Sequence, residues 1–176
     1  MVTPYELRKG AVKIVDAIHD ANPHTILLGG TSSKPAFSLI RAVWKKRYPD
    51  KKMPQHFPLA NATEKHVTGK KVVIFEELIA SGRTIERLHT LYVSQLRPAE
   101  VVKMALVNAE PNNKHPNVIT GIAHAGHLGM DLGVDWRSNL KSMIHAGEKN
   151  EARILARQIR EKREELRSIA RLVKRK

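Results

Sequence analysis

The hydrophobic positions in the first 50 residues follow two different spacings. Between residues 4 and 20 they recur every three or four residues, which is typical of one face of an α-helix (Leu7, Ala11, Ile14, Val15 and Ile18). Residues 24–28 instead form a short apolar run that ends in small residues, as a buried strand does. A second helical pattern begins at Pro35 and ends in a basic cluster before Pro49. The pattern therefore predicts a helix, a strand and a helix.

The same alternation returns further along the chain. Residues 72–75 are the clearest strand, residues 84–96 follow a helical pattern, and residues 101–107 form another buried strand. Parallel strands need long crossover connections, so this order predicts an α/β fold with a mostly parallel sheet flanked by helices. Ligands of such sheets bind at the carboxyl ends of the strands. Weaker strand patterns lie within residues 49–58, 118–123 and 128–134.

The last 31 residues have a different composition. Neither Gly nor Pro occurs after Gly147, and apolar residues recur at a four-three spacing interrupted by Lys162. Residues 151–176 contain ten basic and four acidic residues. The sequence thus predicts an α/β domain over residues 1–145 and a basic amphipathic helix over residues 146–176. Three roles for this helix are compatible with its pattern: packing or dimerisation, contact with nucleic acid, or a solvated charged helix.

Charge and composition narrow the function classes. The chain has 31 Lys and Arg against 17 Asp and Glu, a net charge of +14, which favours polyanionic partners. The absence of Cys excludes disulfides, cysteine nucleophiles and thiolate metal sites. No apolar run reaches the roughly 18 residues that cross a bilayer, and the first residues do not resemble a signal peptide. We therefore expect a cytoplasmic protein that makes no membrane contact.

The strand at residues 72–75 leads into the most informative segment. Glu76 and Glu77 follow it directly, and the small and hydroxyl residues of positions 80–84 come next, before a helix (Ala80, Ser81, Gly82, Arg83 and Thr84). Backbone N–H groups at a helix start bind phosphate, and hydroxyl groups and Arg83 add donors and charge. The two carboxylates lie at the right separation to accept hydrogen bonds from sugar hydroxyls. The segment predicts a sugar-phosphate site.

Residues 72–84 resemble the phosphoribosyl diphosphate signature of the type I phosphoribosyltransferases, and Thr68 to Lys71 resemble the lead-in of the hypoxanthine-guanine members. The resemblance implies that Glu76 and Glu77 are catalytic and orient the ribose, while residues 80–84 hold its 5-phosphate. It further implies a diphosphate loop after the first strand, which here contains Gly29, Gly30, Thr31, Ser32 and Lys34.

Residues 132–136 are similar to the base-binding segment of the purine members. The resemblance implies that Val134 and Trp136 contact the base and that Asp135 binds Mg²⁺. Two departures leave the acceptor base open. Ala80 stands where the hypoxanthine-guanine members carry an Asp, and Asn108 stands where they carry a Lys that reads the base; the acidic pair is also Glu-Glu rather than Asp-Asp or Glu-Asp.

The leading functional hypothesis is a phosphoribosyltransferase with Mg²⁺ as cofactor, with a partner set of phosphoribosyl diphosphate and a nucleobase or nucleotide. It transfers ribose 5-phosphate to a purine or related base and releases diphosphate. The alternative is a non-catalytic relative that binds nucleotide or RNA through its basic surface, and a structural subunit of a ribonucleoprotein is a third class. The apolar seam of the C-terminal helix favours a homodimer.

Overall fold

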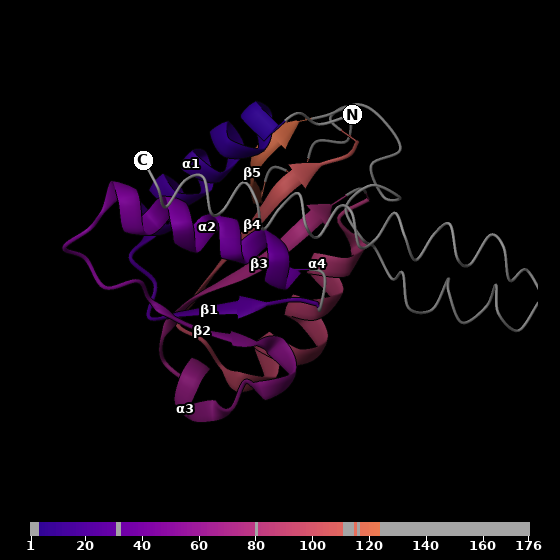
Figure 1. The fold of residues 1–176 in the computed structure, drawn as a ribbon. Helices are drawn as coiled ribbons and strands as arrows, with labels where there is room; N and C mark the ends of the chain where they lie inside the picture. Colours follow the sequence, from indigo (N-terminus) through magenta and orange to yellow (C-terminus); the bar gives the residue numbers. More distant parts are fainter. Residues whose placement is uncertain (1–3, 31–32, 80, 111–114, 116, 124–176) are drawn as a thin grey trace, which may run out of the picture.

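The computed structural model describes residues 4–30, 33–79, 81–110, 115 and 117–123 (Figure 1). In chain order the elements are α1 (Pro4–Ala21), β1 (Thr25–Leu28), α2 (Ser33–Arg47), β2 (Gln55–Pro58), η1 (Leu59–Asn61), α3 (Glu64–Val67), β3 (Lys71–Ile79), α4 (Arg83–Leu88), η2 (His89–Val93), η3 (Ser94–Leu96), β4 (Glu100–Asn108) and β5 (Val118–Ala123). Within these ranges, no helix combines the length and the apolar character that crossing a membrane requires.

The five strands form one parallel sheet in the order β2-β1-β3-β4-β5. β1 pairs with β2 on one side and with β3 on the other, and Leu28 at its end lies beside Phe75. The predicted α/β fold with a mostly parallel sheet is therefore confirmed. The weak strand patterns in residues 49–58 and 118–123 correspond to β2 and β5.

Helices cover both faces of the sheet (Figure 1). On one face, α1 and α2 bury their apolar stripes against the sheet, where the ring of Phe37 lies 5.4 Å from that of Phe75. On the other face, Val67, Ile85 and Val93 bring α3, α4 and η2 against Val72 and Ile74. Burying each large apolar side chain contributes about 1.5–3 kcal/mol, so these two clusters hold the helices firmly on the sheet.

One predicted element differs from the structure, and one helix of the structure was not predicted. The helix expected over residues 84–96 is α-helical only to Leu88, then continues as the π-helix η2 and the 3-10 helix η3. Ser94 donates a hydrogen bond to the Thr90 carbonyl at 2.6 Å, a contact that distorts helices, and Arg97 ends the segment at φ 50°. The short helix α3 was not predicted. The strand expected at 128–134 and the helix at 146–176 lie outside the described residues.

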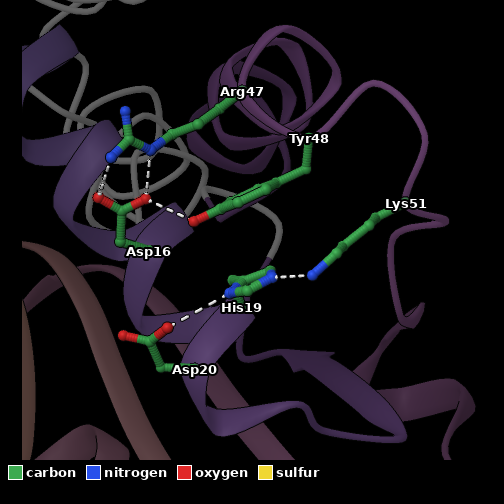
Figure 2. Close-up of polar contacts among 6 residues, drawn as sticks. All are labelled: Asp16, His19, Asp20, Arg47, Tyr48 and Lys51. Atoms are coloured by element: carbon green, nitrogen blue, oxygen red, sulfur yellow. Dashed lines mark hydrogen bonds and ion pairs between the residues drawn. The ribbon is translucent and has the colours of Figure 1, made fainter.

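A polar cluster joins the carboxyl-terminal ends of α1 and α2 (Figure 2). Asp16 accepts hydrogen bonds from Arg47 Nη2 at 2.8 Å, from Arg47 Nε, and from the Tyr48 hydroxyl at 3.0 Å. His19 stacks on the Tyr48 ring at 4.1 Å and contacts Lys51 Nζ. This cluster lies on the side of the sheet where β1 begins, that is, at the amino-terminal ends of the strands. The predicted phosphate loops follow the carboxyl-terminal ends.

Candidate functional site

The order of the strands places a topological switch point between β1 and β3, the position at which α/β sheets generally form their ligand-binding crevice. The chain leaves β1 toward α2 on one face of the sheet and leaves β3 toward α4 on the other. At such a switch point the loops that follow adjacent strands diverge, and ligands of α/β proteins bind between them. The two loops predicted to bind phosphate, residues 29–32 and 80–82, are the loops that flank this point.

The first loop packs directly against the first acid of the signature. Gly29 donates its N–H to the Phe75 carbonyl at 3.0 Å. A Cβ atom at Gly29 would lie 2.0 Å from Glu76 Oε1 and 2.7 Å from Leu88 Cδ1, so no larger residue fits. The loop then turns into α2, where Ser33 donates its N–H to the Gly30 carbonyl at 3.2 Å. The structure therefore brings Gly29 and Glu76 together.

Glu76 is a buried carboxyl group with a raised pKa. Its side chain accepts a hydrogen bond from the Ser33 hydroxyl, with 3.1 Å between Oγ and Oε2, and the residue is only 6% exposed. Burial raises its pKa from 4.5 to about 7, and the Ser33 hydrogen bond opposes this rise. At neutral pH the group therefore exchanges readily between its charged and neutral forms, which is the range in which acids and bases act in catalysis.

Both acids lie deeper in the strand than the sequence suggested. We expected Glu76 and Glu77 just beyond the strand, but β3 continues to Ile79 because Leu78 and Ile79 pair with Val107 and Asn108 of β4. Glu77 is only 2% exposed. The acids therefore do not end the strand, as the sequence suggested; they are buried within β3, two to three residues before its end.

The second loop presents its polar side chains to solvent. Gly82 precedes α4 with φ 71°, a left-handed conformation that glycine adopts without strain. Ser81, Arg83 and Thr84 around it are exposed, and Ser81 Oγ lies 3.5 Å from the N–H nitrogen of Arg83. The side-chain donors of these three residues are therefore exposed to solvent.

Two residues near the site were missed by sequence reasoning. Ser33 stands four residues beyond Gly29, and its hydroxyl within a Gly-Ser loop was a usable signal. His115 comes from the segment between β4 and β5, and a Cβ atom on Gly82 would lie 2.7 Å from its Nδ1. No sequence pattern links His115 to a glycine 33 positions earlier, because the sheet alone brings them together.

Other predicted residues have different surroundings. Lys34, in the first turn of α2, is exposed. Asn108, at the position where the hypoxanthine-guanine members carry a Lys, accepts the N–H of Glu110 through Oδ1 at 3.0 Å, so it stabilises a local turn. Six predicted site residues lie outside the described residues: Thr31, Ser32, Ala80, Val134, Asp135 and Trp136.

The described residues do not form a magnesium site by themselves. Within the part of the chain that the structure describes, no three His, Asp or Glu side chains gather where they could hold a metal. Mg²⁺ is commonly bound by one or two carboxylates together with substrate phosphates.

The fold is shared with known enzymes. A hypoxanthine-guanine-xanthine phosphoribosyltransferase matches with a TM-score of 0.52 at 13% identity, over 68% of this chain and 74% of that one. The Schistosoma mansoni hypoxanthine-guanine phosphoribosyltransferase, solved with IMP, matches with a TM-score of 0.51 at 17% identity. The match covers 66% of this chain and 62% of that one. The Trypanosoma cruzi hypoxanthine phosphoribosyltransferase, solved with its product IMP, matches with a TM-score of 0.53 at 16% identity. The match covers 73% of this chain and 77% of that one.

Comparisons by sequence gave no such match: no protein-family model and no curated protein matches the chain. At these identities the likeness to the solved structures establishes the fold. The chain has the type I phosphoribosyltransferase-like α/β fold.

Proposed function

We propose that the protein binds phosphoribosyl diphosphate in the crevice between β1 and β3 and transfers its ribose 5-phosphate to a purine or related base. The observation that carries this proposal is the packing of Gly29 against Glu76 Oε1. It supports a site in which two phosphate-binding loops flank one pair of acids. A ligand with phosphate groups at both ends of a sugar needs this arrangement.

Each loop takes one end of the ligand in this proposal. Residues 80–84 bind the 5-phosphate through backbone N–H groups, the Ser81 and Thr84 hydroxyls and the Arg83 charge. The side chains of Ser81, Arg83 and Thr84 are exposed. Residues 29–32 bind the diphosphate through their backbone, and Lys34 neutralises part of its charge. Val134 and Trp136 hold the base.

The reaction is a displacement at the anomeric carbon of the ribose. The bond between the anomeric carbon and the diphosphate oxygen breaks, with its electron pair leaving on the diphosphate, and a bond to a ring nitrogen of the base forms. The proton of that nitrogen passes to the released diphosphate or to water. Glu76 and Glu77 orient the ribose, and their negative charge favours the positive charge that develops on the sugar. Asp135 would be the protein ligand of Mg²⁺, and the ion, when bound, would lower the charge of the leaving diphosphate.

A second candidate function rests on the distribution of charge. The layer formed by α1 and α2 carries eight exposed basic side chains: Arg8, Lys9, Lys13, Lys34, Arg41, Lys45, Lys46 and Arg47. Together with the net charge of +14, they favour binding of RNA or another polyanion. Binding of this kind weakens strongly as the salt concentration rises.

One titration tests both candidates. Phosphoribosyl diphosphate with Mg²⁺ is titrated calorimetrically into protein freed of nucleic acid, and into the double variant Ser81→Ala, Thr84→Ala. The control is Thr90→Ala with Ser94→Ala, which removes two hydroxyls from η2 and η3 of the same helical segment. We expect micromolar binding that only the loop variant loses, followed by diphosphate release when bases are added.

The opposite result is equally informative. If the wild-type protein gives no heat with phosphoribosyl diphosphate, the proposed transferase function is wrong. Salt-sensitive binding of RNA by the same sample then supports the second candidate.

A further inference from the structure

The side chain of Ser33 connects the two loops. Ser33 is the first residue of α2 and is fully buried, which is unusual for a hydroxyl at a helix start beside a ligand loop. Its Oγ donates to Glu76 Oε2 at 3.1 Å, while Glu76 Oε1 lies against Gly29. One carboxyl oxygen of Glu76 therefore accepts a hydrogen bond from Ser33, and the other lies close to Gly29.

The Ser33 hydrogen bond acts on the charge of Glu76 as well as on its direction. A hydroxyl that donates to a carboxylate stabilises the ionised form, and here it lowers a pKa that burial raises. Hydrogen bonds to charged groups are stronger than those to neutral groups, so Ser33 favours a fixed, ionised Glu76. A ligand that contacts the loop preceding Ser33 therefore also acts on the carboxyl group on β3.

We propose that Ser33 is a positioning residue that fixes the Glu76 carboxyl group and so couples occupation of the first loop to the acid that receives the ribose. This inference rests on the proposed function. Ser33 touches no substrate in it; it acts through Glu76.

The elements packed around Glu76 also carry charged residues, although none of them is among the causes of its pKa shift. Those on the elements packed around it are Lys34 of α2, Glu77 of β3, Lys103 of β4, Glu86 and Arg87 of α4, and His89 of η2. Lys103 Nζ lies 2.6 Å from Glu86 Oε2, so this nearly buried cation has its own counter-ion. The pKa of Glu76 is set first by burial and then by Ser33. Removing the Ser33 hydroxyl should therefore change the pKa of Glu76 measurably.

The first experiment needs no ligand. The titration of the Glu76 carboxyl carbon is followed by NMR in protein labelled with ¹³C-glutamate, with Glu76→Gln to assign the signal. We expect Ser33→Ala to raise the midpoint by about one pH unit, from the strength of a hydrogen bond to a charged group. Ser33→Thr keeps the hydroxyl and the midpoint. Ser38→Ala, which removes an exposed hydroxyl from the same helix, leaves the midpoint unchanged.

The second experiment measures affinity for phosphoribosyl diphosphate with Mg²⁺ between pH 6 and 8. We expect Ser33→Ala to bind about tenfold more weakly at pH 7, with its pH dependence displaced upward, and Ser33→Thr to restore both. An unchanged midpoint in Ser33→Ala overturns the role of Ser33. A shifted midpoint with unchanged affinity overturns the coupling. If the wild-type protein does not bind the ligand, the proposed function fails, while the NMR titration still decides whether Ser33 positions Glu76.

Discussion

Two polar clusters, at opposite ends of the strands of the sheet, surround their carboxyl groups with different partners. In the cluster of Figure 2, Asp16 faces the Arg47 guanidinium and the Tyr48 hydroxyl, and the pair is open to solvent. The hydrogen bond to Asp16 raises the pKa of Arg47, so the guanidinium stays charged. At the site, Glu76 is buried and its hydrogen bond comes from the neutral hydroxyl of Ser33.

The difference in burial between Asp16 and Glu76 distinguishes a structural cluster from a candidate functional site. Exposed ion pairs lose little in solvation and contribute little, about 0–1 kcal/mol. A buried carboxyl group beside a neutral partner destabilises the folded state whenever it is charged. Proteins retain such groups where binding or catalysis needs them. The comparison therefore supports the crevice, and not the cluster of Figure 2, as the place of chemistry.

The largest effect is expected from Glu76→Gln. The pKa of Glu76 is about 7 in the folded protein and 4.5 in the unfolded chain, so the folded state holds a proton that the unfolded state loses as the pH rises. The free energy of unfolding should fall between about pH 4.5 and 7 and then level off, a loss of about 3 kcal/mol. Glu76→Gln should abolish this loss, as urea unfolding at pH 5 and pH 8 will measure.

The control for this prediction is Glu64→Gln. Glu64 is an exposed carboxyl group in α3, and removing it should leave the pH dependence of unfolding as it is in the wild type. Equal pH dependence in wild type and Glu76→Gln would contradict the description of Glu76 as a buried acid.

The next largest effect is expected from Gly29→Ala. The added methyl group overlaps the Glu76 carboxyl group and Leu88, and overpacking of this kind destabilises by about 2 kcal/mol. Urea unfolding measures the loss, and calorimetry should find no binding of phosphoribosyl diphosphate. The double variant Gly29→Ala, Glu76→Ala should regain part of the stability, since the overlapping carboxyl group is gone. Additive losses in the double variant would refute the contact.

A smaller effect is expected from Gly82→Ala in the second loop. An alanine at φ 71° is strained by about 1 kcal/mol, and its methyl group would also displace the His115 ring. Gly69→Ala is the matched control, because Gly69 has φ 67° and no atom lies within 4 Å of the added methyl group. Both variants should lose similar stability from the backbone, whereas only Gly82→Ala should weaken ligand binding in calorimetry. Equal affinity of the two variants would remove Gly82 from the site.

The fold was predictable because its elements leave local patterns. The apolar stripe of α1 and the continuous apolar run of β3 each depend on residues close in the sequence. The π-helix after Leu88 was not predictable, because its side chains fit the α-helical period equally well. The strand that continues past Glu77 to Ile79 depends on β4, which lies about 30 residues away.

The candidate site divides in the same way. The signature at residues 72–84 carries its own chemistry in consecutive residues, so Glu76 and the loop around Gly82 could be found from the sequence. The contacts of Ser33 with Glu76 and of His115 with Gly82 join residues 43 and 33 positions apart. Only the order of strands in the sheet makes them neighbours. Sequence reasoning therefore located the loops but not the contacts that set the pKa and orientation of the acid.

The smallest effect is expected from Arg47→Ala in the cluster of Figure 2. Although Arg47 makes two hydrogen bonds to Asp16, both side chains are open to solvent, and Tyr48 still donates to Asp16. We expect a loss of less than about 1 kcal/mol in urea unfolding, smaller still in high salt, and no change in the affinity for phosphoribosyl diphosphate. A loss of unfolding free energy above about 2 kcal/mol, or weaker ligand binding, would mean that the cluster of Figure 2 and the candidate site are energetically coupled. The cluster of Figure 2 would then not be a purely structural feature.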